Sequence, residues 1–165
     1  TLIMNRRTAI KQFFIIAGGL TILSSCLNDG GASIVLNKLK ISAEDEQFLG
    51  DLANILIPKS DTPGGKDLNL HLFVIKMVDD CESPENQAKF VAGFNKLRKQ
   101  LNLANSKETE TALAGLKDQT DEKAFFEIFK SRAIQGYMNS EYVMKNKVIY
   151  KLIPGPYNGA VKVKA

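Results

Sequence analysis

Few side chains of this chain could carry out chemistry. His71 is the only histidine among 165 residues, and the chain has two cysteines, Cys26 and Cys81. A Ser-His-Asp or Cys-His site would have to use His71, and no residue is marked as its nucleophile. We therefore predict that His71 lies on the flank of a helix and touches a partner, and we keep a catalytic role for it as an alternative.

The sequence predicts no metal and no cofactor in this chain. One histidine and two cysteines do not supply a zinc set. No Cys-x-x-Cys-His motif for covalent haem is present, and the glycine pairs do not form the GxGxxG of a dinucleotide site. Asp79 and Asp80 are adjacent on a predicted helix, so their carboxylates point apart, and we expect both to be solvated or to meet a basic partner.

The N-terminal stretch has the layout of a secretory signal. Arg6, Arg7 and Lys11 precede an apolar run over 13–23, and small residues then lead to Cys26. The run is too short to span a bilayer, which needs about 20 apolar residues. The alternative is an ordinary buried N-terminal helix, which explains neither the arginine pair nor the cysteine. We predict a signal over 1–26.

Two motifs refine this prediction. NRRTAIK resembles the twin-arginine export motif, and LSSC resembles a lipobox, in which Cys26 is acylated and becomes the new N-terminus. We therefore expect export by the twin-arginine route and a lipoprotein anchored by Cys26 on the periplasmic side of a membrane. Residues 27–41 contain NDGG and predict a flexible tether. Cys81 is then unpaired, and we expect a buried structural thiol, with a bond to another chain as the alternative.

The charge distribution argues against nucleic acid as a partner. The formal net charge is +4, but three of the 22 basic residues lie in the leader, and 19 then face 18 acidic residues. The body has no basic run, so its surface lacks the footprint of a nucleic-acid-binding protein.

The body, from residue 42 onward, predicts a small all-α domain of five or six helices. Ser42 is a predicted N-cap with Asp45 as its capping-box partner, and Pro58 ends that helix. A second helix is predicted over 68–78, with Leu68, Leu72, Ile75 and Val78 in one stripe. The further helices are expected after Ser83-Pro84, around 113–116, from a cap at Asp121, and from Ser140 toward Tyr150, followed by an irregular C-terminal tail over 153–159.

Three segments of this body resemble the gluconate 2-dehydrogenase subunit 3 family. They are 52–65 (LANILIPKSDTPGG), 125–141 (FFEIFKSRAIQGYMNSE) and 150–159 (YKLIPGPYNG). The resemblance covers about 42–162, so the family-like domain is expected over 42–165. The twin-arginine leader is also typical of this family. Ala160 stands where many members carry a cysteine after the final glycine, which leaves Cys81 without an evident partner.

The resemblance implies a non-catalytic small subunit of a membrane-associated sugar or polyol dehydrogenase. In such complexes a large flavoprotein binds FAD and oxidises the sugar, a cytochrome c subunit often takes the electrons in its haem, and the small subunit supports export and maturation of the flavoprotein. The matching segments suit a partner interface, which we predict at Thr62, Pro63, Gly64, Gly65, His71, Tyr137, Pro154, Gly155 and Tyr157. The alternative is a free-standing periplasmic lipoprotein that binds a ligand or an envelope component.

Overall fold

The computed structural model describes residues 31–148, 153, 155 and 160. The predicted export signal at Arg6, Arg7 and Lys11, the lipidation site Cys26, and the predicted interface residues Pro154 and Tyr157 lie outside the described residues.

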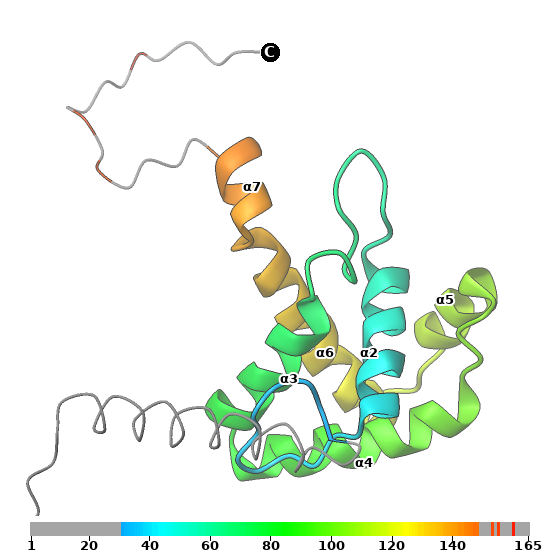
Figure 1. Cartoon of the computed structure of the whole chain (residues 1–165). Helices are drawn as coiled ribbons and strands as arrows, with labels where there is room; N and C mark the ends of the chain where they lie inside the picture. Colours follow the sequence, from blue (N-terminus) through cyan, green and yellow to red (C-terminus); the bar gives the residue numbers. More distant parts are fainter. Residues whose placement is uncertain (1–30, 149–152, 154, 156–159, 161–165) are drawn as a thin grey trace, which may run out of the picture.

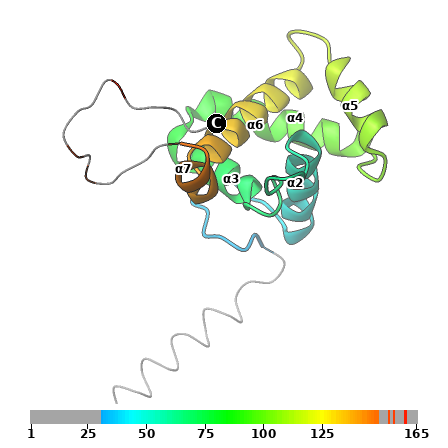
Figure 2. The same cartoon turned by 90° about the horizontal axis from the view of Figure 1, so that it is seen from above.

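The described residues form a small all-α domain without a named strand, which confirms the predicted fold class. Figure 1 shows the arrangement, and Figure 2 shows that α5 and α7 lie on opposite sides of the domain. The six helices within the described residues are α2 (Ala43–Leu56), α3 (Leu70–Cys81), α4 (Pro84–Gln100), α5 (Ser106–Ala114), α6 (Asp121–Met138) and α7 (Glu141–Asn146). None of these helices is both long and apolar enough to cross a membrane.

Local capping signals explain where the helices begin. Ser42 and Asp45 form the predicted capping box, with Ser42 Oγ accepting from the Asp45 N–H at 3.1 Å and the carboxylate accepting from the Ser42 N–H at 3.0 Å. Ser83 caps α4 ahead of Pro84, as predicted. The cap of α6 is Thr120 rather than Asp121, because the Thr120 side chain accepts from the Lys123 N–H.

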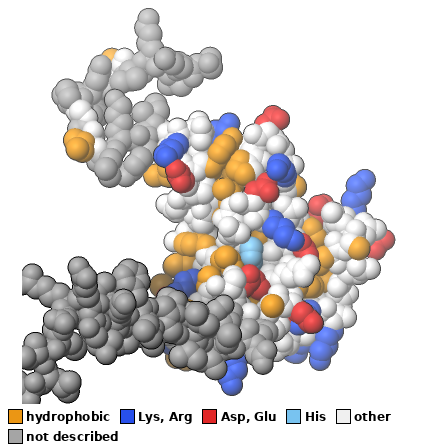
Figure 3. All heavy atoms as spheres, in the orientation of Figure 1, with side chains coloured by type: hydrophobic (Ala, Val, Ile, Leu, Met, Phe, Trp, Pro, Cys, Tyr) orange, Lys and Arg blue, Asp and Glu red, His pale blue; other side chains and the backbone are white. Residues whose placement is uncertain are grey.

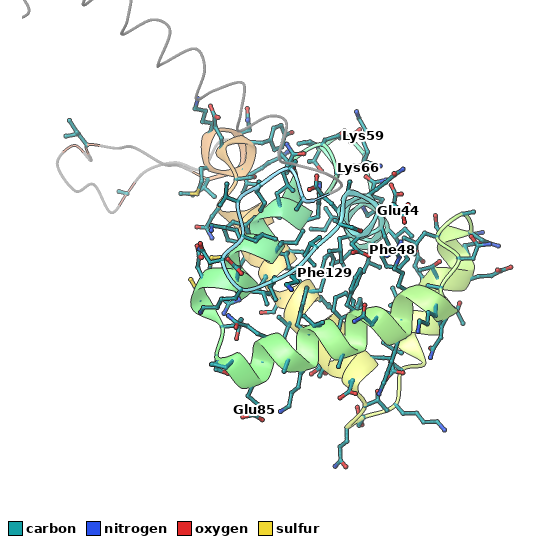
Figure 4. The ribbon with its side chains drawn as sticks, turned by 60° about the horizontal axis from the view of Figure 1, so that its bottom comes forward. Glu44, Phe48, Lys59, Lys66, Glu85 and Phe129 are labelled. Carbon is teal, nitrogen blue, oxygen red and sulfur yellow. The ribbon has the colours of Figure 1, made fainter. Side chains whose placement is uncertain are left out.

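The core is built mainly from phenylalanine. Phe125 of α6 stacks at tilted angles on Phe90 and Phe94 of α4, with ring centroids 4.8 and 5.7 Å apart, and on Phe129 at 5.7 Å. Such ring pairs add stability beyond the burial of their area. Figure 4 shows Phe129 inside the domain, whereas Lys59, Lys66 and Glu85 point outward.

The buried stripe of α3 differs from the predicted one. Leu68 and Leu72 are only half-buried. The buried positions are instead Leu70, His71, Val74, Ile75, Val78 and Asp79. The prediction was right for Ile75 and Val78. A search for apolar periodicity alone could not find His71 and Asp79, the two polar residues of the buried stripe.

The predicted flexible tether is wrong for residues 31–41, which pack against the domain. Ala32, Leu39 and Ile41 are at most 8% exposed and belong to the core cluster. The Ala32 N–H donates to the Ile41 carbonyl at 2.9 Å and closes the segment into a loop. The start of this loop is held by Ser33, whose N–H and Oγ both donate to the Glu46 carboxylate of α2.

Asp79 secures the far side of this loop. Its side chain is fully buried and accepts the backbone N–H groups of Asn37, Lys38 and Leu39 at 2.7–2.8 Å. Burial, the largest influence, opposes ionisation of Asp79, but the three N–H donors and the Lys76 ammonium outweigh it, and the pKa is lowered. The expectation of a solvated Asp79 is therefore wrong, whereas Asp80 is exposed and pairs with Lys76.

Cys81 also departs from its prediction. It is the last residue of α3, and its thiol is exposed rather than buried. The interior side of this helix end is already filled by Val78 and Asp79.

We expect Asp79→Asn to lower the free energy of unfolding by about 2 kcal/mol, because the amide no longer supplies acceptors for all three N–H groups, of which that of Leu39 is buried. Urea unfolding at pH 7 measures the loss. Trypsin should then cut after Lys38 or Lys40, since the loop is released. Asp80→Asn is the matched control and should change stability by no more than about 0.5 kcal/mol. Equal losses in the two variants would contradict the role assigned to Asp79.

Candidate partner interface

The α2–α3 loop, residues 57–69, carries four of the predicted interface residues. Thr62 and Pro63 are half-buried, and Gly64 and Gly65 are buried. The Gly65 N–H donates to the Ile57 carbonyl at 2.8 Å, and its own carbonyl accepts from the Leu70 N–H at 3.0 Å. These two backbone groups of Gly65 are therefore not free to bind a partner, because they hold the loop on the ends of α2 and α3.

Gly65 is required here for close approach of two backbone segments. A Cβ atom at this position would lie 2.2 Å from the Ala53 carbonyl oxygen, far inside any real contact. The TPGG motif thus marks the loop correctly, but the second glycine serves packing against α2.

A hollow of about 680 Å³ opens between this loop, α3, the end of α6 and α7. Tyr142 of α7 reaches across to the loop, where its Oη donates to the Asp61 carbonyl at 3.4 Å. One wall of the hollow is formed by residues 67–70 and Phe73. The other wall comes from the end of α6 and from α7, and consists of Gly136, Asn139, Ser140, Glu141, Tyr142, Lys145 and Asn146. The hollow therefore unites the loop with the 125–141 segment, two parts of the chain that lie far apart in sequence.

Gly136 sets the depth of the hollow. A Cβ at this position would lie 2.7 Å from the Phe73 ring, so α6 approaches α3 closely only because residue 136 is glycine. The α7 helix then starts from a cap at Ser140, whose Oγ accepts from the Val143 N–H at 3.3 Å. This fixes Tyr142 and the Glu141–Lys145 ion pair along one wall.

The carboxylates of the hollow are held ionised. The Gly64 N–H, followed by the Lys59 ammonium at 3.3 Å, lowers the pKa of Asp67. A hydrogen bond from Lys145 lowers the pKa of Glu141. The hollow therefore presents fixed charges of both signs beside its apolar floor, a mixture typical of a protein-docking surface.

Three exposed apolar side chains adjoin this end of the domain. Ile134 and Met138, one turn apart on α6, are 45% and 52% exposed, and Val148 after α7 is 44% exposed. Figure 3 shows hydrophobic side chains gathered between α7 and the α2–α3 loop. We call the hollow together with Ile134, Met138 and Val148 the α6–α7 surface. Apolar side chains that cluster at a surface mark sites of protein contact.

The remaining predicted interface residues are scattered. Tyr137 is half-buried on α6 and does not line the hollow. Gly155 is exposed, with no atom within 4 Å of the position of a Cβ. The sequence interpretation missed Ile134, Met138 and Tyr142, although apolar residues at i and i+4 on the polar side of a helix were a usable signal.

His71 was predicted to touch a partner, but the structure buries its side chain inside the domain. Its imidazole is 7% exposed and lies against Gly50 of α2, where a Cβ would be 3.5 Å from the ring. Its buried Nδ1 has no hydrogen-bond partner within the part of the chain that the structure describes. Burial, the largest influence, lowers the pKa of His71, while Glu46 and Asp51 oppose this and Lys66 adds to it. His71 is thus a core residue between α2 and α3 rather than part of the α6–α7 surface.

We expect His71 to make the fold sensitive to mild acid. Since its pKa is lower in the folded than in the unfolded chain, where it is about 6.5, the unfolded chain binds the extra proton as pH falls below that value. Stability then drops by up to about 1.4 kcal/mol per pH unit below 6.5. In His71→Phe the difference in unfolding free energy between pH 7.5 and 5.5 should shrink, and an unchanged difference would contradict this assignment.

Comparison with known proteins assigns the chain to a family. The family model for gluconate 2-dehydrogenase subunit 3 matches residues 43–155, which includes all six helices and the α6–α7 surface. No curated protein and no solved structure matches the chain. Among the described residues, no group of three His, Cys, Asp or Glu side chains is placed to hold a metal ion. The family match confirms the sequence resemblance: the chain belongs to the gluconate 2-dehydrogenase subunit 3 family and is an accessory subunit of a dehydrogenase complex.

Proposed function

We propose that this chain is the non-catalytic small subunit of a membrane-associated, FAD-dependent sugar or polyol dehydrogenase. It escorts the large flavoprotein through the twin-arginine route, supports its maturation and anchors it on the periplasmic side by lipidated Cys26. The FAD belongs to the flavoprotein, and haem belongs to a cytochrome c subunit where the complex has one.

The observation that carries this proposal is the pairing of a twin-arginine leader with the family match over the helical body. The twin-arginine route transports folded proteins, yet the sequence of this chain contains no cofactor motif that would require folding before export. A flavoprotein that folds around FAD and travels bound to this chain accounts for the leader. Acylation of Cys26 then leaves the complex attached to a membrane.

The α6–α7 surface supports a docking role. It offers Ile134 and Met138 as exposed apolar anchors on α6, and Asp67 with the Glu141–Lys145 ion pair along the hollow. Burial of two such side chains against a partner favours binding by about 1.5–3 kcal/mol each. The surrounding charges favour one orientation of the partner over others.

We expect the double variant Ile134→Asp/Met138→Asp to bind the flavoprotein more than about tenfold less tightly, because two buried contacts become buried charges. Co-purification from solubilised membranes measures the complex, and circular dichroism checks the helices. Glu127→Ala is the matched control, because this exposed residue lies on the same helix two turns nearer its N-terminus. If the unaltered chain is purified colourless and without a flavoprotein, that result would favour the free-standing lipoprotein instead.

We expect Arg6→Lys/Arg7→Lys to leave both this chain and the flavoprotein in the cytoplasm. Cys26→Ser should permit export of both but release them from the membrane, because the acyl anchor is gone. Fractionation with flavin fluorescence separates the outcomes. Export of active flavoprotein in cells that carry the twin-lysine variant would contradict the escort role.

A further inference from the structure

The packed loop 31–41 brings the body of the protein close to its proposed anchor. Five residue steps separate Cys26 from Gly31, a distance of at most about 18 Å even when fully extended. We propose that the outer edge of this loop, Val35, Lys38 and Lys40, lies on the anionic headgroups of the membrane, which gives the subunit a fixed orientation. This inference rests on the proposed acylation of Cys26.

The loop is held firmly enough to act as a contact surface. Its backbone is tied to Asp79 by three N–H bonds and to itself by the bond from Ala32 to Ile41. At its tip, the Lys76 ammonium donates to the Val35 carbonyl at 3.2 Å. The outward side chains therefore need little further ordering when they meet a surface.

The outward side chains suit an anionic lipid surface. Val35 is 83% exposed at the tip, although its neighbours Ile34 and Leu36 pack against the core. Lys38 and Lys40 are exposed on either side of the buried Leu39. At a membrane surface an exposed apolar side chain can enter the headgroup region, while exposed lysines are attracted to anionic lipid.

Nearby carboxylates leave these two lysines free. Asp79 is buried with its N–H donors, Asp80 pairs with Lys76, and Glu46 accepts from Ser33. Among residues 31–148, neither Lys38 nor Lys40 lies within 4 Å of a carboxylate oxygen. Their positive charge therefore remains available to a negative surface.

The proposed orientation leaves the α6–α7 surface open. The α2 helix starts at the 31–41 loop and ends at the α2–α3 loop, and its 14 residues span about 21 Å. Figure 1 shows the 31–41 loop at one end of the domain and α7 with the α2–α3 loop at the other. The flavoprotein would therefore dock on the side away from the lipid.

Fluorescence quenching on vesicles tests this orientation. The mature acylated protein, with Cys81→Ser, carries a single fluorophore at Asn37→Cys in the loop or at Lys59→Cys in the distal α2–α3 loop. Vesicles contain phosphatidylcholine with phosphatidylglycerol, or phosphatidylcholine alone. We expect brominated lipid to quench the label at residue 37, and aqueous acrylamide to quench the label at residue 59.

Charge reversal provides the control. Lys38→Glu/Lys40→Glu should reduce the lipid contact of residue 37 by at least about fivefold for each lysine on anionic vesicles, and much less on phosphatidylcholine alone. Lys107→Glu/Lys117→Glu makes the same change in net charge on exposed residues near α5 and should leave the contact unchanged. Equal acrylamide quenching at both labels would overturn the proposed orientation but leave the proposed acyl anchor at Cys26 in place. The mass of the N-terminal peptide reports acylation, and an unacylated Cys26 would overturn the anchor and the orientation together.

Discussion

The buried carboxylate of Asp79 is the interaction on which the rest of the domain depends. One side chain on α3 satisfies three consecutive backbone N–H groups of a segment that precedes all six described helices. The Leu39 N–H would otherwise be buried without an acceptor, at about 1–3 kcal/mol, and the half-buried N–H groups of Asn37 and Lys38 would lose their partner. Through this contact the 31–41 loop covers one end of the phenylalanine core, and Leu39 and Ile41 become part of that core.

Much of the fold could be predicted because its signals are local. The capping box at Ser42, the Ser83-Pro84 start of α4 and the cap at Ser140 each depend on residues within four positions. The burial of Asp79 could not be predicted in the same way, because its donors lie about 40 residues away. The burial of His71 could not be predicted either, because it depends on Gly50 of another helix, which makes room for the His71 ring.

The candidate site could likewise be predicted only in part from the sequence. The TPGG and GYMNSE motifs mark the α2–α3 loop and the end of α6, and the structure brings these two segments to one hollow. The motifs do not indicate which residues face outward: Gly65 serves packing against Ala53, while Ile134 and Met138 supply the exposed apolar surface. The chain belongs to a family of dehydrogenase subunits, and in the proposed complex a partner would cover this surface.

The phenylalanine core has an optical consequence. The chain has no tryptophan and only four tyrosines, so the domain is nearly silent in fluorescence excited at the red edge of the tyrosine band. Any tryptophan emission from a complex that contains this subunit therefore belongs to its partners. The proposed docking at the α6–α7 surface can therefore be tested through the partner's own tryptophan emission, without a label on either protein.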